Sequence, residues 1–536
     1  RERERERARE REREKDCCVL IAKRHYTHTH PLSLSLSHTH TPPLPSLCSA
    51  LTTGAALQAM TFSLNLGRLG NALAWFLGIQ PYELFFYIFL PPLLADAGVR
   101  IDWFLFRRQV VQILTAAFLV VGGTTGLMIP LLLYGLRLVD RGWTWAHVAL
   151  LGSMLASTDA VAILDVMKVR GGPRRLRVLL EGESLLNDAS SFTLFTIFLA
   201  RVLGDTSGPQ SGAGVAGLVI ANMLKLAAGG LVIGAAVGAA AHVVLRWMRA
   251  RGAGVDQQVA LTLAGGYLAF YGANSVHLSG VVAVAVFGLY GAATSTWDLP
   301  PTPGAAAAFA AFWDALSFVA NATVFFFTGA AIVNFFVRSA RDMRREELAG
   351  LPLANASAAA LADRDLWAGL WRFPFVYAIV FGLRFALLVA FRPLFRLEGS
   401  DLPVREAAFA TVAGLRGSVA LILAQAVITS DFNAPADQAK VRAEIVLWTA
   451  LFVLCTLLIN APTLPWWLRV LKLDAIPEAR LALRRRAVGA LRAHTAKVVD
   501  GLRADGEDAF AGVDWGRVRE FVDVSGAEFD DFAGVG

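Results

Sequence analysis

Long uninterrupted apolar runs are the feature that most limits what this chain can fold into. They recur from residue 84 to residue 471, and most approach the roughly 20 residues that a helix needs to cross a bilayer. Lipid offers no water to unpaired backbone groups, so only helices and closed barrels span it. Barrel strands would alternate apolar and polar residues over about ten positions, whereas these runs are continuous. The sequence therefore predicts an all-α, polytopic membrane protein.

The composition agrees with a membrane location. Hydrophobic residues make up 55% of the chain and charged residues only 17%, whereas about 25% of a soluble domain is charged. The net charge of +7 reflects arginine-rich loops and does not indicate a nucleic-acid surface. The cysteines are too few and too scattered for a disulfide framework; they are Cys17, Cys18, Cys48 and Cys455.

The apolar runs divide into about eleven predicted membrane helices. Their approximate ranges are 84–99, 109–136, 146–167, 178–203, 215–247, 257–272, 276–293, 305–337, 367–391, 405–429 and 443–471. If these spans alternate, most arginine and lysine clusters fall on one side, as the positive-inside rule requires. The arginine-rich loop 338–366 is the exception. The membrane domain is expected to cover 81–471, followed by a short cytosolic tail at 472–536.

The N-terminal segment has a different character. Residues 1–47 contain alternating Arg-Glu, Thr-His and Ser-Leu dipeptides, and the first methionine is Met60. Such alternation is what translated dinucleotide repeats would give, so this leader is expected to be disordered or untranslated rather than a charged helix or a histidine metal site. Residues 48–80 are ambiguous and hold at most one poor span.

Polar and acidic residues interrupt two neighbouring apolar runs. Ser157, Thr158 and Asp159 lie in the middle of one run, although a charge at the bilayer centre costs at least about 2.5–3.5 kcal/mol. Small and hydroxylated residues there permit a broken helix whose freed backbone groups can bind an ion. We therefore expect the helix to be interrupted at 157–159 and its carboxylate to be functional.

The next run carries the segment Glu181–Asp188, which places polar side chains on two adjoining stripes of a helix. Ser184 and Asp188 are four residues apart and share one face, as do Glu183 and Asn187. The first stripe offers oxygen ligands for a cation and the second an internal network. Oxygen ligands of this kind suit Na⁺ or Li⁺ and are a poor match to zinc or copper.

Two arginines within spans complete the set of buried charges. Arg384 and Arg416 each need an acidic partner, and Glu183 is the candidate. Arg384 is favoured, because Arg416 lies beside a glycine-flanked break and is expected to face the cavity. Asp96 lies near a span end, where it could be a ligand or simply pair with Arg100.

These motifs resemble the monovalent cation/proton antiporter family of the NhaP and plant salt-tolerance sodium/proton exchanger type. Leu90–Asp96, Thr158-Asp159, Glu181–Asp188 and Gly414–Gly417 match its motifs in order. The resemblance implies an inverted-repeat antiporter fold with two crossed, unwound helices, around 158–159 and 415–416. It also implies that a separate bundle, without the unwound helices, forms a homodimer interface. The family's first helices are not identifiable before residue 80.

The resemblance also implies roles for individual residues. Asp188 would be the main cation- and proton-binding carboxylate, with Asp159, Ser184, the Thr158 carbonyl and Asp96 as further ligands of the transported Na⁺. Glu183, Asn187 and either Arg384 or Arg416 would form the supporting network. The sequence departs from the family at Asp96, where the family has glutamate, and at Ala160, where it usually has proline.

The expected function is exchange of Na⁺, or of K⁺ or Li⁺, for a proton by alternating access. Asn187 before Asp188, in place of a second aspartate, resembles the electroneutral branch with one Na⁺ for one proton. No cofactor and no enzymatic activity are expected, since the spans carry no nucleophile and base in catalytic context. The plasma membrane is favoured over endomembranes. A cation channel, or a transport-inactive sensor or scaffold with this fold, remains an alternative.

Overall fold

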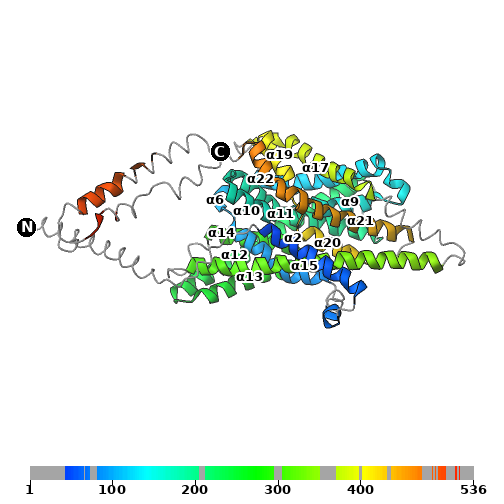
Figure 1. Ribbon diagram of the computed structural model, residues 1–536, viewed down its shortest axis with the longest axis horizontal. Helices are drawn as coiled ribbons and strands as arrows, with labels where there is room; N and C mark the ends of the chain where they lie inside the picture. Colours follow the sequence, from blue (N-terminus) through cyan, green and yellow to red (C-terminus); the bar gives the residue numbers. More distant parts are fainter. Residues whose placement is uncertain are drawn as a thin grey trace, which may run out of the picture.

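The computed structural model describes residues 43–64, 67–72, 81–204, 212–294, 305–349, 370–396, 401–430, 436–473 and parts of 486–518. Within these ranges the chain forms helices and turns, apart from one isolated bridge between Asp159 and Leu415. The helices run mostly along the long axis and form two neighbouring bundles (Figure 1). The predicted all-α membrane fold is therefore confirmed.

The first bundle is built around the predicted spans 84–99, 215–247, 257–272, 276–293 and 305–337. α12, α13 and α14 pack on one another, α14 packs on α5, and α15 packs on α2. The elements are α2 (Pro43–Ser63), α4 (Pro81–Leu84), η1 (Phe85–Phe89), α5 (Leu90–Arg100), α12 (Gly212–Ala250), α13 (Val255–Ser275), α14 (Gly280–Thr294) and α15 (Ala305–Ala349).

The second bundle holds the two interrupted spans. α9 packs on α8 and α11, α17 on α8 and α19, and α20 on α21. Its elements are α7 (Val110–Leu114), η2 (Thr115–Val120), α8 (Val121–Pro130), η3 (Leu131–Gly135), α9 (Trp145–Ala156), α10 (Val161–Arg170), α11 (Arg174–Val202), α17 (Phe373–Ala390), α19 (Val404–Val412), α20 (Ser418–Thr429), α21 (Ala436–Cys455), η7 (Thr456–Asn460) and α22 (Ala461–Val470). The connecting helices are α6 (Trp103–Phe106), η4 (Leu138–Arg141) and α18 (Arg392–Phe395).

All eleven predicted segments contain helix. By length and composition alone, five described helices could each cross a membrane unaided; these are Val110–Gly135, Gly214–Ala250, Ala307–Ala331, Phe373–Ala390 and Val441–Val470. The other predicted spans are shorter, are broken or carry more polar residues. α9, which ends at the first break, and α20, which begins after the second, are both short apolar helices. Those breaks are where the ionisable residues gather.

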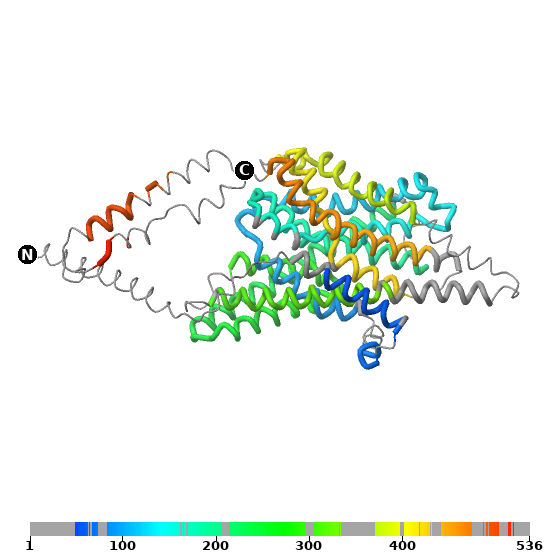
Figure 2. The backbone as a smooth tube through the Cα atoms, viewed as in Figure 1, coloured from blue at the N-terminus to red at the C-terminus, as the bar shows by residue number. Residues whose placement is uncertain are grey.

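The N-terminal part of the described chain differs from the expected boundary at residue 47. α2 begins at Pro43, inside the segment expected to be leader, and runs beside α15 (Figure 2). Prolines in a first helical turn cost little, because the first amides have no helical partner. Residues 1–42, with the repeats, lie outside the described residues.

Two glycines explain how closely α2 and α15 approach. A Cβ atom added at Gly54 would lie 2.0 Å from the backbone oxygen of Phe326, and one at Gly329 would lie 2.2 Å from that of Leu51. Small residues allow two membrane helices to bring their backbones together. Most of α2 falls in the ambiguous segment 48–80, and this helix packs against α15 of the first bundle.

Two extended segments cross where the predicted breaks lie. α9 ends at Ala156 and α10 begins at Val161, while α19 ends at Val412 and α20 begins at Ser418. The amide of Asp159 donates to the carbonyl of Leu415 over 2.7 Å. This crossing is the predicted pair of unwound helices, and the first break forms with Ala160 where the family usually has proline.

Candidate ion-binding site

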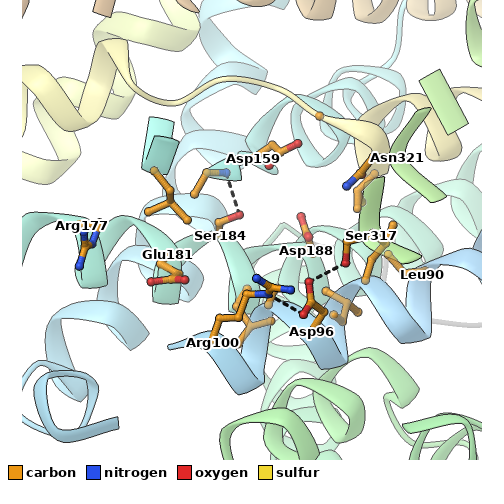
Figure 3. Close-up of a pocket in the computed structure, with 18 of the residues that line it drawn as sticks. Leu90, Asp96, Arg100, Asp159, Arg177, Glu181, Ser184, Asp188, Ser317 and Asn321 are labelled. Atoms are coloured by element: carbon orange, nitrogen blue, oxygen red, sulfur yellow. Dashed lines mark hydrogen bonds and ion pairs between the residues drawn. The ribbon is translucent and has the colours of Figure 1, made fainter. Parts of the chain in front are cut away.

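A cavity of about 600 Å³ lies beside the crossing of the two extended segments (Figure 3). Its walls come from both bundles: α5 and α15 on one side, and α11 with the two helix breaks on the other. Asp96, Asp159, Ser184 and Asp188 all line it. The structure thus brings four of the predicted cation ligands to one space, from three separate stretches of sequence.

Asp188 is held by a residue that sequence reasoning did not assign to the site. The hydroxyl of Ser157 donates to Oδ1 of Asp188 over 2.5 Å. Ser157 caps the C-terminus of α9 in an extended conformation, which turns its side chain toward α11. The available signal was its position two residues before Asp159, within the predicted break.

The first break also uses Ser184 of α11. The amide of Ala160 donates to Oγ of Ser184 over 3.2 Å, which satisfies a backbone group that the broken helix leaves without a helical partner. Because Ser184 and Asp188 are one turn apart and both line the cavity, this stripe of α11 faces it. Their role as cation ligands stays a prediction.

The second stripe of α11 lies away from the cavity. Asn187 Nδ2 donates to the hydroxyl of Thr158 over 2.6 Å, and both side chains are buried. Neither residue is among those that line the cavity. The Thr158 side chain is therefore committed to the internal network, and a ligand role for its carbonyl stays a prediction.

The buried ion pair expected at Glu183 forms with Arg384. Arg384 Nη2 lies 2.7 Å from Oε1 of Glu183, and the two side chains are only 3% and 2% exposed. Arg384 Nε also donates to the carbonyl of Ala410 over 3.4 Å. The pair links α11 to α17, so its charges compensate each other within the second bundle.

Arg416 does not face the cavity, and that expectation was wrong. Its side chain is 1% exposed, and Nη1 donates to the carbonyl of Gly414 over 2.7 Å. The guanidinium carbon lies 5.4 Å from the ring centre of Phe452 and 6.0 Å from that of Phe381. Aromatic faces and a freed carbonyl of the second break accommodate this cation, where the sequence offered only its glycine neighbours as context.

Asp96 is paired rather than open. Its Oδ1 accepts from Nε of Arg100 over 2.6 Å and its Oδ2 from the hydroxyl of Ser317 over 2.6 Å. Arg100 also pairs with Asp314 over 2.6 Å. The sequence had left a ligand and an ion-pair role open for Asp96. Ser317 and Asp314 of α15 were missed, although an aspartate inside the apolar run 305–337 was a visible signal.

The charges around the cavity favour cations. Its lining residues include six carboxylates and only three guanidiniums; these are Asp96, Asp102, Asp159, Glu181, Asp188 and Asp314, with Arg100, Arg174 and Arg177. A cleft lined by an excess of one sign raises the local concentration of the opposite ion. Among the described residues, no group of three or more His, Cys, Asp or Glu could hold a metal ion.

The sequence matches one known family over most of its length. The family described as "Sodium/hydrogen exchanger, transmembrane" matches residues 29–470. Sodium/hydrogen exchanger 7 of Arabidopsis thaliana is 26% identical over 442 residues, which are 81% of this chain and 35% of that protein. Sodium/hydrogen exchanger 8 of the same plant is 27% identical over 417 residues, covering 77% of this chain and 50% of that protein. The chain thus spans half or less of the length of these two relatives.

A solved structure shares the fold. The sodium proton antiporter MjNhaP1 from Methanocaldococcus jannaschii aligns with a TM-score of 0.51 at 19% identity. The alignment covers 80% of this chain and 98% of that one. The arrangement of helices described above is therefore that of an antiporter fold.

Proposed function

Because the chain belongs to the sodium/hydrogen exchanger family, we propose that it exchanges a monovalent cation, Na⁺ in the first place, for a proton across a membrane. The observation that carries this proposal is the meeting of Asp159 and Asp188 in one cavity at the crossing of two broken helices. Two carboxylates with nearby hydroxyls form an oxygen-rich site that suits a small hard cation.

Exchange follows from competition for the same oxygens. The Asp188 carboxylate can bind a proton or help to coordinate a cation, and protonation removes the negative charge that the cation needs. Ser157 orients one oxygen of Asp188, and Asp159 supplies a second carboxylate in the same cavity. If only the loaded site moves between the two sides of the membrane, each cation that crosses in one direction requires a proton to cross in the other.

A stoichiometry of one cation for one proton is part of the proposal. On α11, Asn187 occupies the position before Asp188, and it donates to Thr158 outside the cavity. It therefore adds no titratable group to the site. The buried Glu183–Arg384 pair is internally neutral, so it adds no net charge to the site. This scheme assigns the proton to Asp188, while Asp159 stays a carboxylate.

Alternating access would move the second bundle against the first. The cavity lies between them, with α5 and α15 on one wall and α11 with the breaks on the other. In this scheme the first bundle also mediates homodimer formation. An interface on this bundle is compatible with the surface of α12, which exposes large apolar side chains that lipid or a second copy could cover. These side chains are Ile220, Leu224, Leu231, Val232, Val243 and Trp247. Residence in the plasma membrane stays a prediction.

Sodium uptake into proteoliposomes tests the function. The purified chain should take up ²²Na⁺ when a pH gradient is imposed, and Asp188→Asn should abolish this uptake because it keeps the shape and removes the titratable group. Arg396→Gln is the matched control, since Arg396 is exposed and pairs with Asp401 away from the cavity. Uptake that is independent of the pH gradient would indicate a channel. No uptake by correctly folded wild-type protein would favour a sensor or scaffold.

A further inference from the structure

Asp96 lies in the wall of the cavity, yet both of its carboxylate oxygens already have partners (Figure 3). Arg100 Nε donates to Oδ1 and the Ser317 hydroxyl donates to Oδ2, each over 2.6 Å. Asp96 is 7% exposed, so water contributes little to its environment. In this arrangement each oxygen of Asp96 already accepts a hydrogen bond from Arg100 or Ser317.

Arg100 is a permanent cation at the wall of this cavity, and its side chain is 36% exposed. A guanidinium is not deprotonated in proteins, and this one contacts Asp96 one turn earlier on α5 and Asp314 on α15, each over 2.6 Å. It therefore does for Asp96 what a transported cation would do: it supplies the positive charge that the carboxylate needs. A cation that binds Asp96 would therefore compete with Arg100 for the same negative charge.

We propose that Arg100 is a positioning residue that acts as a tethered counter-cation. It holds Asp96 out of the ion site and thereby sets the affinity of that site for the transported cation. This inference rests on the proposed function, because it assumes that a monovalent cation binds at Asp159 and Asp188. Cation affinity in oxygen-ligand sites depends on the number of charged ligands. Freeing Asp96 would add a third carboxylate to the same cavity.

A simpler role for Arg100 would be to clip α5 to α15. That role predicts a loss of stability when Arg100 is replaced, without a change in cation affinity. A third role, in which Arg100 merely repels cations through its charge, predicts a gain in affinity that does not depend on Asp96. The three roles therefore differ in what happens when Asp96 is removed as well.

The test is a double-mutant cycle on Na⁺ binding and transport. Wild type, Arg100→Gln, Asp96→Asn and the double variant are purified, and ²²Na⁺ binding to each protein is measured together with the KM and maximal rate of uptake. Arg100→Gln is expected to lower the dissociation constant and the KM for Na⁺ by about tenfold, equivalent to ~1.4 kcal/mol. Arg100→Lys keeps the charge and should stay near wild type. Thermal unfolding of each variant is recorded in parallel.

The double variant decides between the roles. We expect Asp96→Asn/Arg100→Gln to have the same dissociation constant as Asp96→Asn, because without Asp96 there is no carboxylate to release. An unchanged affinity in Arg100→Gln would overturn the proposal, as would an equal gain in the Asp96→Asn background.

Asp96→Asn alone provides a second check if Arg100→Gln folds poorly. It is expected to weaken Na⁺ binding much less than Asp188→Asn does. An equal loss would show that Asp96 coordinates the ion despite Arg100, and would overturn the proposal. Wild-type protein that binds no Na⁺ would instead overturn the proposed function, and this inference with it.

Discussion

The backbone amide of Asp159 donates a hydrogen bond to the carbonyl of Leu415 over 2.7 Å. This single contact joins two helix breaks that are far apart in sequence, and it places the Asp159 carboxylate at the crossing. The neighbouring Gly417 is also extended, and its Cα lies so close to Asp159 that an added Cβ would be 2.2 Å from Oδ2. The position of a predicted ion ligand is thus set by the backbone of the opposite break.

Gly417→Ala should therefore impair transport. The added methyl group has to displace the Asp159 side chain, and misplacing a reacting group by about 1 Å can cost about a hundredfold in rate. We expect pH-driven ²²Na⁺ uptake to fall by at least about tenfold on the same reasoning, with a smaller effect on thermal stability. Gly382→Ala is the control, because nothing lies within 4 Å of a Cβ at Gly382. Normal uptake by Gly417→Ala would mean that Asp159 is not held by this contact.

The helix breaks could be predicted because they depend on residues that are neighbours in sequence. The buried ion pair could be predicted because a charge inside a span needs a partner. A run of small and polar residues inside an apolar segment, such as 157–159, is unfavourable unless the helix opens to use it. A charge such as Glu183 inside a span requires a partner, and Arg384 and Arg416 lie well inside two predicted spans. Arg384 was preferred because Arg416 adjoins the glycine-flanked break.

The partners of Asp96 could not be predicted, because they depend on how distant helices pack. Ser317 is 221 residues from Asp96 and Asp314 is 214 residues from Arg100. Periodicity shows which face of a helix is polar, but not which other helix meets that face. The prediction that Arg416 faces the cavity was wrong for the same reason, because its aromatic neighbours Phe381 and Phe452 come from α17 and α21.

Glu183→Ala should destabilise the protein as well as impair transport. Removing one partner of a buried ion pair leaves an uncompensated charge, which typically costs about 3–5 kcal/mol. The midpoint of thermal unfolding in detergent should drop clearly more than for Arg396→Gln, which affects an exposed pair. Replacing both charges, as in Glu183→Gln/Arg384→Met, should recover part of the loss. Equal unfolding midpoints for Glu183→Ala and Arg396→Gln would contradict the idea that Glu183 compensates the buried charge of Arg384.

Asp401, in the connection between α18 and α19, should contribute to stability in a pH-dependent way. Hydrogen bonds from Arg392 and Arg396 hold the pKa of this carboxyl below its usual value of 3.8. A depressed pKa in the folded state stabilises the fold above the unfolded-state pKa, and this contribution disappears as the pH falls through the folded-state pKa. Asp401→Asn should therefore melt slightly below wild type at neutral pH, and the two midpoints should converge in acid. A difference that does not change with pH would rule out this linkage.

Gly54→Ala should weaken the packing of α2 on α15. The new Cβ would lie 2.0 Å from the backbone oxygen of Phe326, and a backbone atom cannot move aside as a side chain could. Overpacking of this kind typically costs about 1–3 kcal/mol, which thermal unfolding in detergent can measure. Gly126→Ala is the matched control, because Gly126 lies inside α8 and a Cβ added there would have nothing within 4 Å. There the loss of glycine's extra backbone freedom favours the helix. If Gly54→Ala melts like wild type, α2 and α15 do not approach as closely at Gly54 and Phe326 as described.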